Sequence, residues 1–269
     1  MKFRPVKSGV QCPVEEKRRQ WIDSCFVWLL RAFRDTALRE KPILTPTPEH
    51  FPVNFAVLEE TAFNVLDIVA PQMDLDPDDI EIDPYQEAAT ELKSGSALNA
   101  RIFLKQVDHE RYSAGHYRGK EEDGKFHIGV EVKTLKVPEK LIAVIAHELA
   151  HLKLLGEGRL KENNEPLTDL CTVIFGLGIF GANSAFRMYN GSYSWGYNRT
   201  GYLSQMDWGY ALALWADIRR EKEPEWVKYL TQNIRHDFKR STQFIQDNSE
   251  LIMKSPPKES DEKTEESKA

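Results

Sequence analysis

The sequence predicts an α+β fold: a mainly helical domain with a small antiparallel sheet in front of its central helix. Apolar residues recur every three or four positions over most of the chain, as they do on the buried face of an amphipathic helix. Two short strand-like runs, 100–107 and 125–133, interrupt that pattern near the middle of the chain. Strands that are grouped between helices, rather than alternating with them, are typical of the α+β class.

The chain up to residue 156 should contain three helices. Helical spacing predicts one long helix at about 14–39 and a second at about 55–69, which Pro71 ends. Pro138 can begin a third helix, because a proline in the first turn removes an N–H that has no partner there. Gly156 suits the position just after the end of that helix.

The sheet is expected between the second and third helices. Residues 116–119 should form a hairpin with 125–133, because Gly124 in the sequence EEDG suits a tight turn that needs a positive φ. A further short strand is expected at the end of the acidic segment DLDPDDIEIDP, and another at 100–107.

The second half should be helical except for one polar loop. A helix is expected to begin near Asn163 or Asn164, and the uncharged run 170–186 should continue it as a buried core helix. A membrane span is the alternative interpretation of this run, but its length is at the lower limit for crossing a bilayer. A tyrosine-rich loop at 192–205 and two closing helices, at 207–220 and 224–245, complete the domain.

Composition limits the class of protein. The formal net charge is −6 and no basic stripe alternates with aromatic residues, so we expect no nucleic-acid partner. Three widely spaced cysteines and an N-terminus without an apolar run predict a cytoplasmic protein, and membrane association is not expected. Residues 255–269 are charged and poor in apolar side chains, which predicts a disordered tail after a single domain at 1–254.

One short sequence carries the candidate chemistry: AVIAHELAHLKLLG, residues 143–156. Residues four apart share a helix face, so His147 and His151 can direct their imidazoles at one zinc ion. Glu148 can face the same pocket without being a ligand and accept a proton from water. The flanking residues are aliphatic, so these side chains should be buried and need a partner, which a metal supplies. The alternative interpretation is two histidines at this spacing by chance.

HELAH followed by NEPLTD, residues 164–169, resembles the gluzincin metallopeptidases, HExxH zincins whose second motif has the form Asn-Glu-x-x-Ser/Thr-Asp on the next helix. The resemblance covers 137–170. It implies a zincin-like domain in which Glu165 is the third zinc ligand and Asp169 accepts a hydrogen bond from a ligating imidazole, His147 being preferred. Asp169 itself is the alternative third ligand. A helix cap followed by an acidic first turn also explains NEPLTD without a metal.

The motif and the resemblance together predict a zinc-dependent hydrolase with one Zn²⁺ per chain, most simply a peptidase acting on a peptide or protein. Its catalytic core should span about 98–250, after an N-terminal helical part at about 14–70. Zincins hold the substrate backbone on an edge strand, for which 125–133 is the expected segment, and His127 on it is expected to be an ordinary surface or core residue. A zincin-like module that binds zinc or a partner without cutting is the alternative.

The transition state of such a hydrolase would also need a hydrogen-bond donor besides zinc. The sequence offers four candidates and does not choose among them: Tyr197, Tyr202, Tyr210 and His236. The apolar positions of the last helix predict that His236 faces solvent.

Overall fold

The computed structural model describes residues 11–56, 58–85, 115–121, 123–191, 194–199 and 202–248, and the statements below concern these residues. They form a mainly helical fold, as predicted. The α-helices are α1 (Glu16–Ala32), α2 (Asp35–Glu40), α3 (Leu58–Gln72), α4 (Pro138–His151), α5 (Glu165–Ile174), α6 (Gly178–Ala185), α7 (Gln205–Ile218) and α8 (Gln232–Asp247). Short 3₁₀ turns are η1 (Pro77–Asp79), η2 (Val132–Lys136) and η4 (Glu225–Tyr229), and a π-helical turn, η3 (Leu152–Gly156), follows α4.

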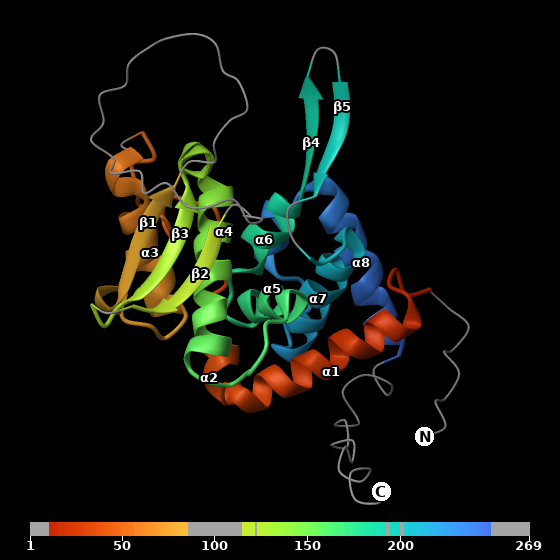
Figure 1. The fold of residues 1–269 in the computed structure, drawn as a ribbon. Coiled ribbons are helices and arrows are strands. Elements are labelled where there is room, and N and C mark those ends of the chain that lie inside the picture. The colour runs from red at the N-terminus through yellow and green to blue at the C-terminus, as the bar shows by residue number, and fades with distance from the viewer. Residues whose placement is uncertain are drawn as a thin grey trace, which may run out of the picture.

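Helix α4 lies at the centre of the fold. Figure 1 shows it between a three-stranded sheet, backed by α3, and the helices α5 to α8. It begins at Pro138, as predicted, and its inward side chains are fully buried, including Leu141, Ile145 and Leu149. Burial of one such aliphatic side chain stabilises the fold by about 1.5–3 kcal/mol. The helix that carries HELAH is therefore held from both sides.

The sheet is mixed, so the prediction of an antiparallel sheet is wrong in part. Its strand order is β1 (Ile80–Tyr85), β3 (Phe126–Glu131), β2 (Gly115–Lys120). β2 and β3 form the predicted antiparallel hairpin around Gly124, whose φ is +81°, whereas β1 pairs with β3 in parallel. Alternation in a sequence indicates which residues are buried, but not which strand lies beside which or in what direction. The strand predicted at 100–107 lies outside the described residues.

Three predicted helix boundaries are wrong. The helix expected at 14–39 breaks at Arg34, which has a left-handed φ of 59°. This break allows Leu38 on α2 to turn into the core and Phe33 to pack edge-on against Phe175, with ring centroids 5.2 Å apart. Pro71 does not end α3 but lies inside its last turn. The helix expected from 224 begins as η4, and α8 starts only at Gln232.

Residues 170–185 of the uncharged run are almost entirely buried, as predicted, but they form two helices instead of one, and Phe186 begins a strand. α5 ends at Ile174, the chain turns at Gly176 with a φ of +77°, and α6 follows. Gly178 and Gly181 allow close contacts with α7, as the glycines in this run suggested. None of the described helices is long and apolar enough to cross a membrane.

A second antiparallel hairpin replaces much of the loop predicted at 192–205. β4 (Phe186–Gly191) follows α6 directly and pairs with β5 (Ser194–Arg199). Figure 1 shows this hairpin projecting from the helical part of the molecule, with its ends near α6 and α7. After β5 the chain enters α7 through a capping box, in which Ser204 and Asp207 each bond the other's backbone N–H. The predicted tail at 255–269 lies outside the described residues.

Candidate metal centre

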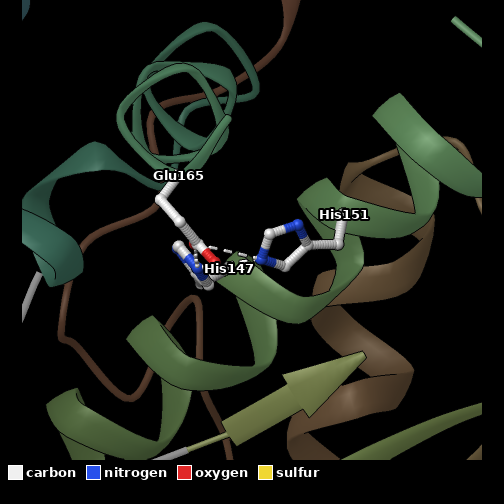
Figure 2. Close-up of side chains that lie close together, drawn as sticks. All are labelled: His147, His151 and Glu165. Carbon is white, nitrogen blue, oxygen red and sulfur yellow. Dashed lines mark hydrogen bonds and ion pairs between the residues drawn. The ribbon is translucent and has the colours of Figure 1, made fainter. Parts of the chain in front are cut away.

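Two consecutive helices bring the predicted ligand residues together. His147 and His151 project from the same face of α4, and Glu165 comes from the first turn of α5, as Figure 2 shows. Asn164 caps α5 by accepting the N–H of Leu167 at 3.2 Å, which fixes where the helix begins. A carboxylate in the first turn of a helix is also favoured by the helix dipole.

The spacing of the three ligand atoms matches a tetrahedral zinc site. Glu165 Oε2 lies 3.0 Å from His147 Nε2 and 3.3 Å from His151 Nε2, and the two imidazole nitrogens are 3.1 Å apart. Two ligands bound to zinc at about 2.0–2.1 Å in tetrahedral geometry are separated by about 3.3 Å. Glu165 therefore fits the third position. The alternative ligand, Asp169, approaches only the opposite nitrogen of His147.

Asp169 takes the position expected of a residue that orients a ligand. Its Oδ1 lies 2.9 Å from His147 Nδ1, so the imidazole can donate there and leave Nε2 toward Glu165 and His151. Asp169 is itself buried, with 5% of its surface exposed. Such a carboxylate–histidine pair fixes the ring orientation and raises the basicity of the ligand.

Three further contacts were not found by sequence reasoning. The side-chain amide of Asn163 donates to Glu165 Oε1 at 2.8 Å, and Thr168 Oγ1 lies 3.5 Å from His151 Nδ1. The backbone N–H of Tyr202 donates to Asp169 Oδ2 at 3.0 Å. Thr168 stands at the Ser/Thr position of the NEPLTD motif, which is a usable signal. No local pattern in the sequence indicates the contact from Tyr202, which is 33 residues away.

The charges of the site are mutually stabilised. Burial alone would lower the pKa of His147, but hydrogen bonds to Asp169 and Glu165 outweigh it and raise that pKa to about 10. Burial would raise the pKa of Glu165, yet its bonds to His147 and His151 hold it well below its usual range. The metal-free site therefore holds a positive imidazole against a carboxylate at neutral pH.

Glu148 is buried beside the ligands, and one of its carboxyl oxygens has no hydrogen-bond partner among the described residues. It is 3% exposed, and none of the described residues offers a hydrogen bond to its Oε2. The pKa of Glu148 is raised to about 8. Burial is the largest cause and the charge of Glu165 adds to it, while the charge of His147 opposes them. A buried, unpartnered carboxyl oxygen costs free energy, which is typical of a group held for chemistry rather than for stability.

The structure separates the four candidate oxyanion donors. Tyr210 is fully buried and its hydroxyl donates to Asp23 on α1 at 2.7 Å, so it is already engaged elsewhere. His236 is exposed on α8, as predicted. Tyr202 lies against the site, with its ring stacked on that of His147 at a centroid distance of 6.1 Å. The side chain of Tyr197 on β5 lies outside the described part.

A second group of possible ligands surrounds His127, on the sheet. His127 Nδ1 lies 3.1 Å from Asp83 and its Nε2 lies 2.9 Å from Asp123, while Glu121 is close by. These contacts join β1, β3 and the hairpin turn, which agrees with the ordinary structural role expected of this histidine.

Comparisons with protein-family models, with curated proteins and with solved structures gave no significant match. The arguments that follow therefore rest on the residues of this chain and on their arrangement.

Proposed function

We propose that this protein is a zinc-dependent hydrolase of the zincin type, most simply a peptidase. The mutual spacing of His147 Nε2, His151 Nε2 and Glu165 Oε2, at 3.0–3.3 Å, carries the proposal, because three ligand atoms converge as a tetrahedral metal requires. The nitrogen and carboxylate donor set suits zinc. Zinc in such a site supplies Lewis acidity and lowers the pKa of water.

The residues of the chain would then have distinct tasks. Glu148 would accept the proton of the attacking water and deliver it to the leaving amine, acting as general base and then as general acid. Its buried Oε2, which has no hydrogen-bond partner in the described part of the chain, supports this role. Asp169 would keep His147 oriented through Nδ1, and the half-exposed phenol of Tyr202 is the best-placed candidate to stabilise negative charge on the substrate oxygen.

The order of strands in the observed sheet changes which strand can hold the substrate backbone. The expected strand, 125–133, contains β3, which lies in the middle of the sheet and has its backbone groups engaged on both sides, so that prediction is wrong. β2 is at the edge of the described sheet and contacts α4. We therefore assign the role of pairing with an extended peptide to β2.

The competing function is a zinc-binding module that does not cut its partner. In such a module the zinc site would be structural, and a fourth protein ligand would close it. In the described part of the chain, the metal-ligand group at this place contains His147, His151 and Glu165, and Asp169 faces the other nitrogen of His147. A three-residue set next to a buried carboxylate favours the enzyme.

The substitution Glu148→Gln tests the proposal, because it removes the proton acceptor and keeps the shape of the side chain. Zinc-loaded wild-type protein and the variant are incubated with denatured casein, new peptide termini are counted by mass spectrometry, and zinc is measured by elemental analysis. We expect about one zinc per chain in both proteins and cleavage in the wild type alone. Glu139→Gln, the same substitution at the start of α4, is the matched control and should cut normally.

Three results would contradict parts of this proposal. A wild-type protein that takes up no zinc would refute the metal site itself. A Glu148→Gln protein that loses its zinc would show that the helix face is assigned wrongly. A wild-type protein that binds zinc and cuts no peptide would favour the non-catalytic module.

A further inference from the structure

Tyr202 contacts the candidate metal centre with two separate parts of the residue. Its backbone N–H donates to Asp169 Oδ2 at 3.0 Å, while the other oxygen of Asp169 faces His147 Nδ1 at 2.9 Å. Its ring lies nearly parallel to the imidazole of His147, with an interplanar angle of 19° and a centroid distance of 6.1 Å. The backbone contact, through Asp169, and the ring contact therefore both act on the imidazole of His147.

We propose that Tyr202 is a positioning residue that holds the imidazole of His147 in its metal-binding orientation, through its ring directly and through Asp169. The proposal rests on the zinc site of the proposed function and concerns a residue that neither sequence motif contains. It is separate from any contact that the phenol makes with a substrate, because it depends on the ring and the backbone N–H alone.

The backbone contact fixes Asp169. A carboxylate that accepts one bond on Oδ1 can still rotate about its side-chain torsion, whereas one that is held at both oxygens has a single orientation. Asp169 Oδ2 is held by Tyr202, so Oδ1 stays aimed at His147 Nδ1. The ring proton then remains on Nδ1, and Nε2 stays directed at Glu165 and His151.

The ring of Tyr202 lies against one face of the imidazole of His147. The side chain of His147 is 19% exposed, whereas that of Asp169 is 8% exposed, so water can reach this pair from the side of the imidazole. A stacked aromatic ring within 4.5–7 Å is an attractive contact and limits rotation of its partner. Tyr202 itself is 44% exposed and therefore contributes little to the core.

The position of Tyr202 in the chain extends the inference to the projecting hairpin. β5 ends at Arg199, three residues before Tyr202, and the capping box of α7 begins two residues after it. Tyr202 thus joins the β4–β5 hairpin to the metal centre. Displacement of the hairpin should act first on Asp169 and His147.

The test compares Tyr202→Phe, which keeps the ring and the backbone N–H, with Tyr202→Ala, which removes the ring. Phe63→Ala on α3 removes an aromatic ring of similar exposure, 41%, from a different helix and is the matched control. The first readout is the downfield proton NMR signal of the His147 Nδ1–H in metal-free protein, assigned by its loss in Asp169→Asn. The second is the zinc affinity, measured by competition with a chelator.

We expect the imidazole signal to persist in the wild type, Tyr202→Phe and Phe63→Ala, and to disappear by exchange with water in Tyr202→Ala. Tyr202→Phe and Tyr202→Ala both lose the hydrogen bond of the phenol to Glu165, so the comparison between these two variants isolates the ring. Zinc should bind about 3- to 10-fold more weakly to Tyr202→Ala than to Tyr202→Phe, as expected for the loss of one aromatic pair, and with wild-type affinity to Phe63→Ala. Because Tyr202 is half-exposed, the melting temperature of Tyr202→Ala should stay close to that of the wild type.

The two readouts separate failure of this inference from failure of the proposed function. An unchanged imidazole signal in Tyr202→Ala, or a zinc affinity equal to that of Tyr202→Phe, overturns the positioning role, and the zinc site remains. A wild-type protein that binds no zinc overturns the proposed function, and the signal in metal-free protein then decides alone whether Tyr202 holds His147.

Discussion

Zinc affinity should depend steeply on pH, because the metal must displace a proton from His147. The pKa of His147 is raised to about 10 in the metal-free site by Asp169 and Glu165, so this imidazole is charged at pH 7. Removing its proton at pH 7 costs about 4 kcal/mol, since three units separate that pH from the pKa and each unit is about 1.4 kcal/mol. One proton released per zinc makes the affinity rise about tenfold per pH unit.

The assay is chelator competition between pH 6.5 and 9, together with calorimetry in two buffers of different ionisation enthalpy to count protons. In Asp169→Asn the carboxylate at Nδ1 is gone, so the pKa of His147 should fall and the slope above pH 7 should flatten. Wild-type affinity that is independent of pH between 7 and 9 would refute the reasoning, because it would mean that His147 is already neutral without metal.

The same pKa values predict how the stability of metal-free protein varies with pH. The pKa of His147 is raised above its unfolded value, so its contribution to stability is complete below about pH 6.5 and is lost as pH rises toward 10. The pKa of Glu148 is raised from 4.5 to about 8, so its neutral carboxyl costs the folded state progressively more stability as pH rises between these two values. Metal-free protein should therefore melt at lower temperature at pH 9 than at pH 6, and zinc should reduce the difference.

Further predictions concern the ligands and the fold. His147→Ala and His151→Ala should each abolish stoichiometric zinc in elemental analysis; full zinc in either would contradict the ligand assignment. Gly181→Ala places a Cβ 2.5 Å from the buried ring of Trp208, so denaturant unfolding should show a loss of about 1–3 kcal/mol, and an unchanged midpoint would refute the close packing. A chain ending at Lys254 should melt like the full chain, because the charged tail lacks apolar anchors; a drop of several degrees would show that it packs.

The candidate site could be predicted from the sequence because its signals are local. Helical spacing puts His147 and His151 on one face, Pro138 marks the start of their helix, and Asn164 marks the start of the next. Each of these depends on residues within one or two turns. The end of the helix that carries HELAH was predicted less well: α4 ends at His151, Gly156 lies in the π-helical turn that follows, and the left-handed glycine is Gly158.

The features that the sequence did not predict depend on contacts between distant segments. The break at Arg34 becomes favourable because Phe33 and Leu38 find partners elsewhere in the core. β1 pairs with β3 in parallel, a direction that no strand pattern encodes. The β4–β5 hairpin was missed because its first strand directly continues an apolar helix, so the change of period is hidden.

The short connection between the two motifs explains why Glu165 can reach the histidines. Thirteen residues separate His151 from Glu165. The π-helical turn after His151 widens the helix before the chain reverses, and π-helical turns are frequent at functional sites. Arg159 then donates to the carbonyl oxygen of Lys153 at 2.9 Å and fastens the connection back onto that turn.

Lys153, in the π-helical turn, is a buried charged residue whose contacts fix the same connection. It is 5% exposed, its ammonium group donates to Glu157 at 2.6 Å, and it lies over the rings of Phe33 and Phe175. Burial lowers the pKa of Lys153, so this charge needs the partners it has. Lys153 therefore anchors the turn against α1 and α5, and the carboxylate of Glu165 arrives beside the histidines because the connection that carries it is held at both ends.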